Sequence, residues 1–297
     1  AWGDIDGPDG IVAVRGWDEM NLRGANALVT GGGSGLGMAC ARWLLRDGAT
    51  VTIVGRDRRR LEWAATELGV EATESAGVRW AVCDVTDEAA VVQAVRFAAE
   101  GSGLQIVVAS AGVGWLAPIA TIPVEAWRNV MEVNLTGNFL TLKHAAPAMR
   151  EAGGGAYTVI SSIAGNTAAP YMTPYAAAKA GVDMFVRSAA DELGPWGIRV
   201  NSVQPGLVPT ELFASLYEDS ETRAEYLDNM TLGRIGSADD VAAAVHFLSG
   251  PSASWITGVC LPVDGGHHLR RSPRFDGYVR SQHGTQWLAE PLAASLD

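Results

Sequence analysis

The sequence lacks any run of apolar residues long enough to cross a membrane, which takes roughly 18 consecutive apolar residues. Residues 1–10 are acidic and rich in glycine, so they also lack the basic and then apolar pattern of a secretion signal. Both absences favour a soluble, cytoplasmic protein that has no membrane partner.

Cysteine is scarce, because Cys40, Cys83 and Cys260 are the only three and each stands alone in an apolar stretch. An odd number at wide spacing predicts neither a disulfide framework nor a zinc site. The pair His267 and His268 has no neighbouring residues that would complete a set of metal ligands. We therefore expect no metal, buried cysteines in a reducing compartment, and a histidine pair that is solvated or locally hydrogen-bonded.

Positive charge is also in short supply, with 22 Lys and Arg against 33 Asp and Glu and a net charge of -11. Such a protein repels a phosphate backbone unless it carries a local basic face, and the sequence shows none. Nucleic acid is therefore excluded as an expected partner.

What the sequence does have is an alternation of short β-branched runs with longer helical patterns, beginning near Ala25. This pattern is typical of repeated βαβ units and of a parallel sheet covered on both faces. No linker rich in proline, glycine or serine divides the series, so a single domain is favoured. The strand candidates are residues 25–29, 50–54, 78–82, 105–109, 156–160, 198–203 and 259–263.

Two segments lie outside the alternation. Residues 1–20 are expected to form an N-terminal extension, and residues 267–297 a C-terminal extension. The second carries Phe275, Tyr278, Trp287 and Leu288, which would cover a surface on the same subunit or on a neighbour. A partly disordered tail is the alternative, and the sequence leaves both open.

A glycine-rich turn, Thr30-Gly31-Gly32-Gly33-Ser34-Gly35-Leu36-Gly37, follows the first predicted strand and opens a helix. Glycines allow a sharp turn and close approach to a pyrophosphate, while the first N–H groups of the helix face its negative charge. The position of the turn between strand and helix therefore indicates dinucleotide binding.

The end of the second strand bears on the choice of cofactor. An Asp or Glu at this point binds the ribose 2′-hydroxyl of NAD, whereas an Arg accommodates the 2′-phosphate of NADP. The chain reads Gly55-Arg56-Asp57, so Arg56 favours NADP(H), with NAD(H) as the alternative. The run of arginines that follows could equally be the exposed first turn of a helix.

Tyr175 and Lys179 are one helical turn apart at the start of a predicted helix, so their side chains share a face. A tyrosine hydroxyl with a pKa of about 10 transfers protons poorly at neutral pH. The Lys179 ammonium would stabilise the phenolate, so we expect it to lower the pKa of Tyr175. Ser162 follows a predicted strand, at the edge where parallel sheets bind ligands, and its hydroxyl could polarise a substrate oxygen.

With these motifs in this order, the chain resembles the classical short-chain dehydrogenase/reductase family over roughly residues 21–266. The matching positions are residues 30–37, Asp84, Asn134, Ser162, Tyr175, Lys179, Pro205, Gly206, and residues 233–236 and 256–266. The resemblance implies an α/β fold with one Rossmann-type, doubly wound, seven-stranded parallel sheet in the order 3-2-1-4-5-6-7 and helices on both faces. It also implies that residues 21–266 are the catalytic domain of a homotetramer, with a homodimer possible.

The resemblance implies a role for each motif. Tyr175 would be the general acid and base, Ser162 would hold the substrate oxygen, Lys179 would bind the nicotinamide ribose, and Asn134 would anchor a water that relays protons to Lys179. The cofactor would be held by Gly31, Gly33, Ser34, Gly35, Leu36, Gly37, Arg56, Asp84, Val85, Ser110, Ala111, Gly112, Tyr175, Lys179, Pro205, Gly206, Val208 and Thr210.

One departure from the family pattern stands after the fourth strand, where Asn-Asn-Ala-Gly is replaced by Ala109-Ser110-Ala111-Gly112. The missing amides remove hydrogen bonds that brace the sheet, and Ser110 is a candidate to replace part of them. The departure bears on the rigidity of the sheet at this point and leaves the expected catalytic residues unchanged.

These features predict an NAD(P)(H)-dependent oxidoreductase that interconverts a hydrophobic ketone or aldehyde and its alcohol. A non-catalytic dinucleotide-binding scaffold, or an enzyme for enoyl reduction or epimerisation, are the alternatives. Residues 207–230 would form a mobile lid. The residues expected to line the substrate pocket are Trp115, Asn166, Tyr171, Phe213 and Tyr217.

Overall fold

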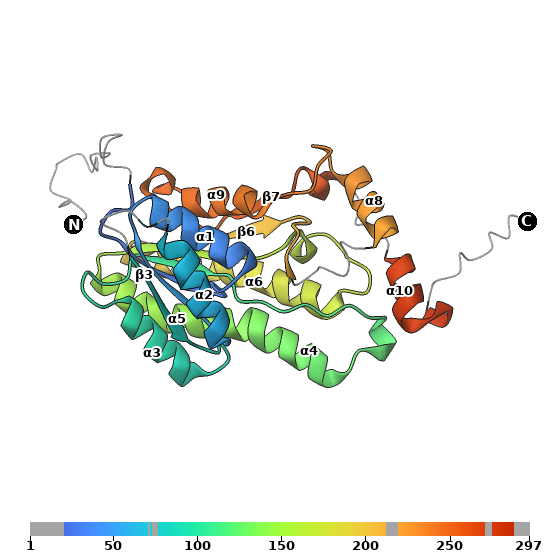
Figure 1. The fold of residues 1–297 in the computed structure, drawn as a ribbon, viewed down its shortest axis with the longest axis horizontal. Helices are drawn as coiled ribbons and strands as arrows, with labels where there is room; N and C mark the ends of the chain where they lie inside the picture. The colour runs from blue at the N-terminus through green and yellow to red at the C-terminus, as the bar shows by residue number, and fades with distance from the viewer. Residues whose placement is uncertain (1–20, 71, 73–76, 212–218, 271–274, 288–297) are drawn as a thin grey trace, which may run out of the picture.

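Seven parallel strands form one sheet in a computed structural model that describes residues 21–70, 72, 77–211, 219–270 and 275–287 (Figure 1). The strands are β1 (Asn26–Thr30), β2 (Thr50–Gly55), β3 (Val78–Val82), β4 (Ile106–Ala109), β5 (Gly155–Ile160), β6 (Ile198–Pro205) and β7 (Cys260–Val263). Their order is β3-β2-β1-β4-β5-β6-β7, which confirms the prediction. Each predicted strand end lies within two residues of the observed one. The largest difference is in β6, which continues to Pro205.

Helices cover both faces of the sheet (Figure 1). One face carries α1 (Gly35–Arg46), α2 (Arg58–Gly69) and α9 (Ala238–Ser249). The other carries α3 (Glu88–Ala98), α5 (Gly137–Glu151) and α6 (Thr173–Leu193). The helix α4 (Val124–Met131) joins α5 through a π-helical segment, η3 (Glu132–Thr136).

The central strands explain why the sequence folds this way. All residues of β1 and β4 are buried, since helices pack on both sides of them. A strand buried on both faces has a continuous apolar run instead of an alternating one. The two hydrophobic cores therefore lie on opposite faces of the same strands, and the carboxyl ends of the strands share one edge.

Two further helices, α8 (Ser220–Asn229) and α10 (Asp276–His283), lie together at one end of the molecule (Figure 1). Phe275 and Val279 are completely buried there, within a cluster that also contains Tyr226 and Met230. Phe275 therefore covers a surface of its own subunit, one of the alternatives that the sequence left open. Residues 1–20 and Leu288 lie outside the described residues.

Cys40 and Cys83 are buried, Cys260 is half-buried, and all three are free thiols. Burial raises the pKa of Cys40 to about 12 and that of Cys83 to about 11, so neither thiol is reactive at neutral pH. In the described part of the chain, no helix is both long enough and apolar enough to span a bilayer.

Candidate active site

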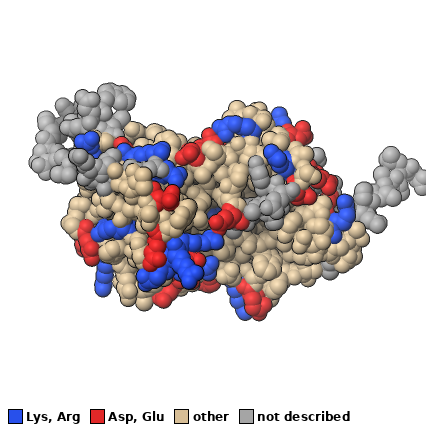
Figure 2. Space-filling model, in the orientation of Figure 1, with Lys and Arg blue, Asp and Glu red and all other residues tan. Residues whose placement is uncertain are grey.

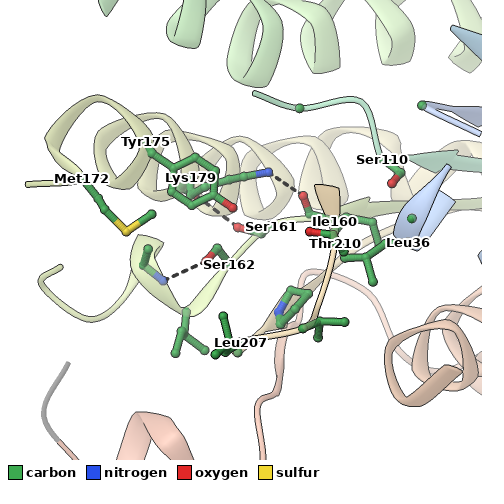
Figure 3. Close-up of a pocket in the computed structure, with 18 of the residues that line it drawn as sticks. Leu36, Ser110, Ile160, Ser161, Ser162, Met172, Tyr175, Lys179, Leu207 and Thr210 are labelled. Carbon is green, nitrogen blue, oxygen red and sulfur yellow. Dashed lines mark hydrogen bonds between the residues drawn. The ribbon is translucent and has the colours of Figure 1, made fainter. Parts of the chain in front are cut away.

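A cavity lies at the carboxyl ends of β1, β4, β5 and β6, where the sequence analysis placed the ligand crevice. Figure 3 shows Tyr175 and Lys179 on α6 above Ser162, with Met172 toward one end of the cavity and Leu36, Ser110 and Thr210 toward the other. The cavity brings together Gly31, Ser34, Gly35, Leu36, Gly37, Ser110, Ala111, Gly112, Ser162, Tyr175, Lys179, Pro205, Gly206, Val208 and Thr210.

The glycine-rich turn is packed too tightly for side chains at two positions. A Cβ on Gly37 would lie 2.3 Å from the carbonyl oxygen of Gly31. Gly31 itself has φ of 65°, in the left-handed region that favours glycine. The turn thereby brings the start of α1 to the edge of the cavity.

The start of α1 fits a pyrophosphate. Ser34 is the N-cap residue, but its side chain makes no capping hydrogen bond, and the first turn carries no acidic residue. The N–H groups at a helix start carry partial positive charge and bind anions. Because the first turn of α1 has no carboxylate of its own to compete with it, a phosphate group is the ligand that this helix start would hold.

Gly37→Ala is expected to raise the Kd for NADPH by at least about tenfold, because the new Cβ must displace the turn that would hold the pyrophosphate. Titration of NADPH by its change in fluorescence measures this. Gly69→Ala is the matched control, since the nearest atom to its Cβ is a Val78 methyl at an ordinary 3.8 Å. Equal Kd values for Gly37→Ala and the wild type would show that the turn does not bind the cofactor.

The side chains of Tyr175, on α6, and Ser162, just after β5, both line the cavity, and the interaction with Ser162 acts to lower the pKa of Tyr175. Ser162 also accepts a hydrogen bond from the Ala164 backbone N–H at 3.1 Å, which fixes its Oγ. The Nζ of Lys179 lies 5.5 Å from the centre of the Tyr175 ring. Two hydroxyls and one amine are therefore aimed at a single volume.

The expected lowering of the Tyr175 pKa is wrong for this structure. Burial raises the pKa of Tyr175 to about 12, and the hydrogen bond from Ser162 opposes the rise only in part. Desolvation disfavours the phenolate, and in this arrangement it outweighs any help from Lys179. Tyr175 is thus fully protonated at neutral pH.

Lys179 is only 4% exposed, and it donates a hydrogen bond from Nζ to the Ile160 carbonyl at 2.7 Å (Figure 3). Burial lowers its pKa to about 8, while the nearby carboxylate of Asp183 raises it. Asp183 is itself held by Ser202 Oγ at 2.9 Å and Gln204 Nε2 at 2.6 Å, both on β6. A buried carboxylate on α6 therefore keeps Lys179 cationic at pH 7 despite its burial.

Asn134 is completely buried in the π-helical segment. Its Oδ1 accepts a hydrogen bond from the Val113 N–H at 3.0 Å, and its Nδ2 donates to the Val113 carbonyl at 2.8 Å. A Cβ on Gly112 would lie 2.9 Å from Asn134 Oδ1 and 4.0 Å from Lys179 Nζ. Asn134 thus anchors the loop after β4 beside Lys179. It does not line the cavity itself, whereas Gly112 and Lys179 do.

The brace after β4 does not come from the Ser110 side chain that sequence reasoning suggested. The hydroxyl oxygen of Thr30 accepts hydrogen bonds from the backbone N–H groups of Ser110, at 3.1 Å, and Ala111, at 3.2 Å. Thr30 is the last residue of β1, so it ties two central strands together at the cavity edge.

Several predicted residues do not line the cavity. Asp84 instead accepts two hydrogen bonds from Thr86 in a turn, and Val85 packs against Gly137. Phe213 and Tyr217 lie outside the described residues. The other predicted residues away from the cavity are Gly33, Arg56, Trp115, Asn166 and Tyr171.

Sequence reasoning missed two aromatic residues of the site. Tyr226 on α8 and His267 after β7 both line the cavity, and both are buried. His268 is hydrogen-bonded to Asp264, as expected for the pair, and His267 packs edge-on against the Tyr226 ring. No local pattern marks either residue, because their contact joins distant parts of the chain.

Comparison with known proteins supports the same picture. A family model described as enoyl-(acyl carrier protein) reductase matches residues 31–268. Cis-4-hydroxycyclohexanecarboxylate dehydrogenase of Sinomonas cyclohexanicum is 41% identical over 245 residues, which are 81% of this chain and 95% of that protein.

Solved structures agree with the sequence relatives. A short-chain type dehydrogenase/reductase from Mycobacterium ulcerans has a TM-score of 0.87 and 38% identity, covering 90% of this chain and 98% of that one. A 7α-hydroxysteroid dehydrogenase, solved with NADH and 7-oxoglycochenodeoxycholic acid, has a TM-score of 0.80 and 30% identity, covering 85% and 97%. This chain therefore belongs to the short-chain dehydrogenase/reductase family, and it is an oxidoreductase that acts on CH–OH groups with a nicotinamide dinucleotide.

Proposed function

We propose that this enzyme interconverts a hydrophobic ketone and its secondary alcohol, with NADP(H) as cofactor and Tyr175 as general acid and base. The observation that carries the proposal is the single cavity that joins a helix start suited to pyrophosphate with the Ser162, Tyr175 and Lys179 side chains. One end would hold the dinucleotide, and the other would hold the carbonyl group.

A bound nicotinamide would exchange hydride with the carbonyl carbon. Ser162 donates a hydrogen bond that orients the carbonyl oxygen, and Tyr175 transfers its proton to that oxygen as the C–H bond forms. Lys179, cationic at pH 7, stabilises the phenolate that Tyr175 leaves behind. Since the pKa of Tyr175 is raised, its proton is in place at neutral pH, which suits the direction of ketone reduction.

The proposed preference for NADP(H) depends on the end of β2. Asp57 is occupied as the N-cap of α2, where its Oδ1 accepts from the Arg60 N–H at 3.2 Å. Arg56 is exposed two residues before α2, and Figure 2 shows basic side chains gathered in the region of α2. A guanidinium with no competing carboxylate is the group that a 2′-phosphate would bind.

Arg56→Ala is expected to raise the KM for NADPH roughly 10- to 100-fold while the KM for NADH stays within about twofold, because only the 2′-phosphate loses a charged hydrogen bond. Steady-state kinetics with both cofactors measures the ratio. Arg58→Ala is the matched control, since the Arg58 guanidinium lies 5.1 Å from the centre of the Trp80 ring and is held there. Equal changes for both cofactors would contradict the assignment.

The substrate class follows from the walls and from the relatives. Met172 and Leu207 are apolar walls of the cavity, and Glu211 at its edge pairs with Arg60. The relative from Sinomonas is named for a cyclic secondary alcohol, and the steroid enzyme was solved with a cyclic ketone. These features favour a cyclic, mainly apolar ketone over a sugar phosphate.

A spectrophotometric assay with NADPH, cyclohexanone and 4-oxocyclohexanecarboxylate tests the proposal. We expect NADPH to be oxidised with at least one of the two ketones, and the alcohol product to be identified by mass spectrometry. Bound NADPH with no turnover of any ketone would favour a scaffold protein. Turnover of an α,β-unsaturated thioester alone would favour enoyl reduction, which the description of the family model names.

The proposed oligomer is a homotetramer. Large apolar side chains are partly exposed on the helices after β4, namely Trp127 on α4 and Phe139 on α5, at 39% and 47%. Met184 on α6 is 57% exposed. Exposed apolar side chains on neighbouring helices are typical of subunit interfaces. Light scattering measures the mass in solution, which should be that of four chains.

A further inference from the structure

The lid of the substrate site is attached to a part of the chain that lies beyond the family domain. The family match ends at residue 268, whereas Phe275 and Val279 follow it and are completely buried. Buried residues that follow the matched domain must pack against it, so they belong to the folded enzyme. Their partners show which part of the enzyme they act on.

Three aromatic rings form what we call the aromatic clasp: His267, Tyr226 and Phe275. The ring of Tyr226 meets His267 edge-on at 5.5 Å between centroids and Phe275 at 6.1 Å. Tyr226 belongs to the lid helix α8, while the other two belong to the chain after β7. Aromatic rings at these centroid distances attract each other beyond the effect of burial. The clasp therefore holds α8 through Tyr226, which lies in the interior of the helix.

Both ends of α8 are also held. Near its end, the Asp228 carbonyl accepts a hydrogen bond from the Arg270 guanidinium. Near its start, the first turn of α10 contacts α8, since a Cβ on Gly277 would lie 2.6 Å from Glu221 Oε2. Within the segment that sequence reasoning expected to be a mobile lid, the helix α8 is therefore held by residues 267–270 and 275–283.

The clasp also lies close to the reacting group. Tyr226 and His267 line the cavity together with Met172 and Leu207, and Tyr226 and Phe275 belong to the same buried cluster as Tyr175. Burial raises the pKa of Tyr226, and the negative charge that Tyr175 can carry adds to the rise. The wall thus stands a short way beyond the carbonyl position.

We propose that the aromatic clasp fixes α8 as a rigid wall and so restricts the substrate to a compact, single-ring ketone or alcohol. A rigid wall leaves no room for a bulky group on the far side of the ring, because packed side chains move only at a cost in free energy. This inference rests on the ketone reduction proposed above.

The first test compares cyclohexanone with 4-phenylcyclohexanone in the full-length enzyme with NADPH. Phe275→Ala removes the support behind Tyr226, so we expect the ratio of kcat/KM for 4-phenylcyclohexanone to that for cyclohexanone to rise roughly tenfold. Phe247→Ala is the matched control, because Phe247 is 41% exposed on α9, and it should leave the ratio unchanged. A parallel change for both ketones in Phe275→Ala, or no change, overturns the proposal.

The second test does not depend on turnover. It uses a leucine variant, so that it still applies if Phe275→Ala folds poorly. Hydrogen exchange followed by mass spectrometry should show α8 amides protected in the wild type and at least about tenfold faster in Phe275→Leu, with α3 amides unchanged. Equal exchange of α8 in the two proteins would contradict the clasp. If neither ketone is reduced while α8 behaves as expected, the proposed function fails and the structural part of the inference stands.

Discussion

Tyr175→Phe should lower kcat for ketone reduction between about 10²- and 10⁴-fold, the range that a general acid contributes. The variant keeps the ring that packs in the cluster with Met172 and Leu207 and removes only the hydroxyl that donates the proton. The Kd for NADPH should change by less than about threefold, because the hydroxyl lies at the substrate oxygen. Stopped-flow reduction and cofactor titration measure the two quantities separately.

Tyr278→Phe is the matched control for this prediction. Tyr278 packs against the same cluster as Tyr175, but it does not line the cavity, so its hydroxyl has no part in the proposed proton transfer. Its variant should keep kcat within about twofold of the wild type. A full rate in Tyr175→Phe would leave the proton transfer without a donor and would refute the mechanism.

The parts of this protein that could be predicted from sequence are those whose pattern is local. The run that became β4 is apolar throughout, and β1 has the apolar centre Ala27-Leu28-Val29, because both faces of these strands are buried; that property is visible in a few consecutive residues. Tyr175 and Lys179 are also local, since one helical turn separates them. Their spacing predicted acid and base chemistry, and the family resemblance then implied the specific role of each residue.

What could not be predicted depends on distant contacts. Nothing near Tyr226 or His267 in sequence shows that their rings meet, or that Phe275, which follows the matched domain, packs against Tyr226. The pKa of Tyr175 is a second case. Spacing shows that Lys179 is close, but only the folded structure shows that burial is the larger effect.

Lys179 is buried as well, so replacing it should lower the activity of the enzyme and raise its stability. We expect Lys179→Met to lower kcat at least about 10²-fold, because the phenolate loses its cation. At pH 7 the variant should also be more stable than the wild type. Lowering the lysine pKa from 10.5 to about 8 corresponds to about 3.5 kcal/mol against the folded state, at 1.4 kcal/mol per pKa unit.

Part of that gain is offset in the variant. Methionine gives no hydrogen bond to the Ile160 carbonyl, and Asp183 loses a neighbouring cation while keeping Ser202 and Gln204. A lost hydrogen bond of this kind costs about 1 to 3 kcal/mol. The net increase in the free energy of unfolding should therefore be about 1 kcal/mol, measured by urea denaturation at pH 7.

The stability difference between Lys179→Met and the wild type should change with pH, which an effect of packing alone would not do. Between pH 8 and 10.5 the unfolded wild-type chain holds a proton on Lys179 that the folded chain has released, so raising the pH stabilises the folded wild type. The advantage of Lys179→Met should be complete below pH 8 and, because the lost hydrogen bond remains at every pH, should turn into a deficit of about 1 to 3 kcal/mol by pH 10.5. Lys143→Met is the control, because Lys143 is half-exposed and paired with Glu88, and it should show no such advantage. If the advantage of Lys179→Met were independent of pH, the buried charge would not be its source.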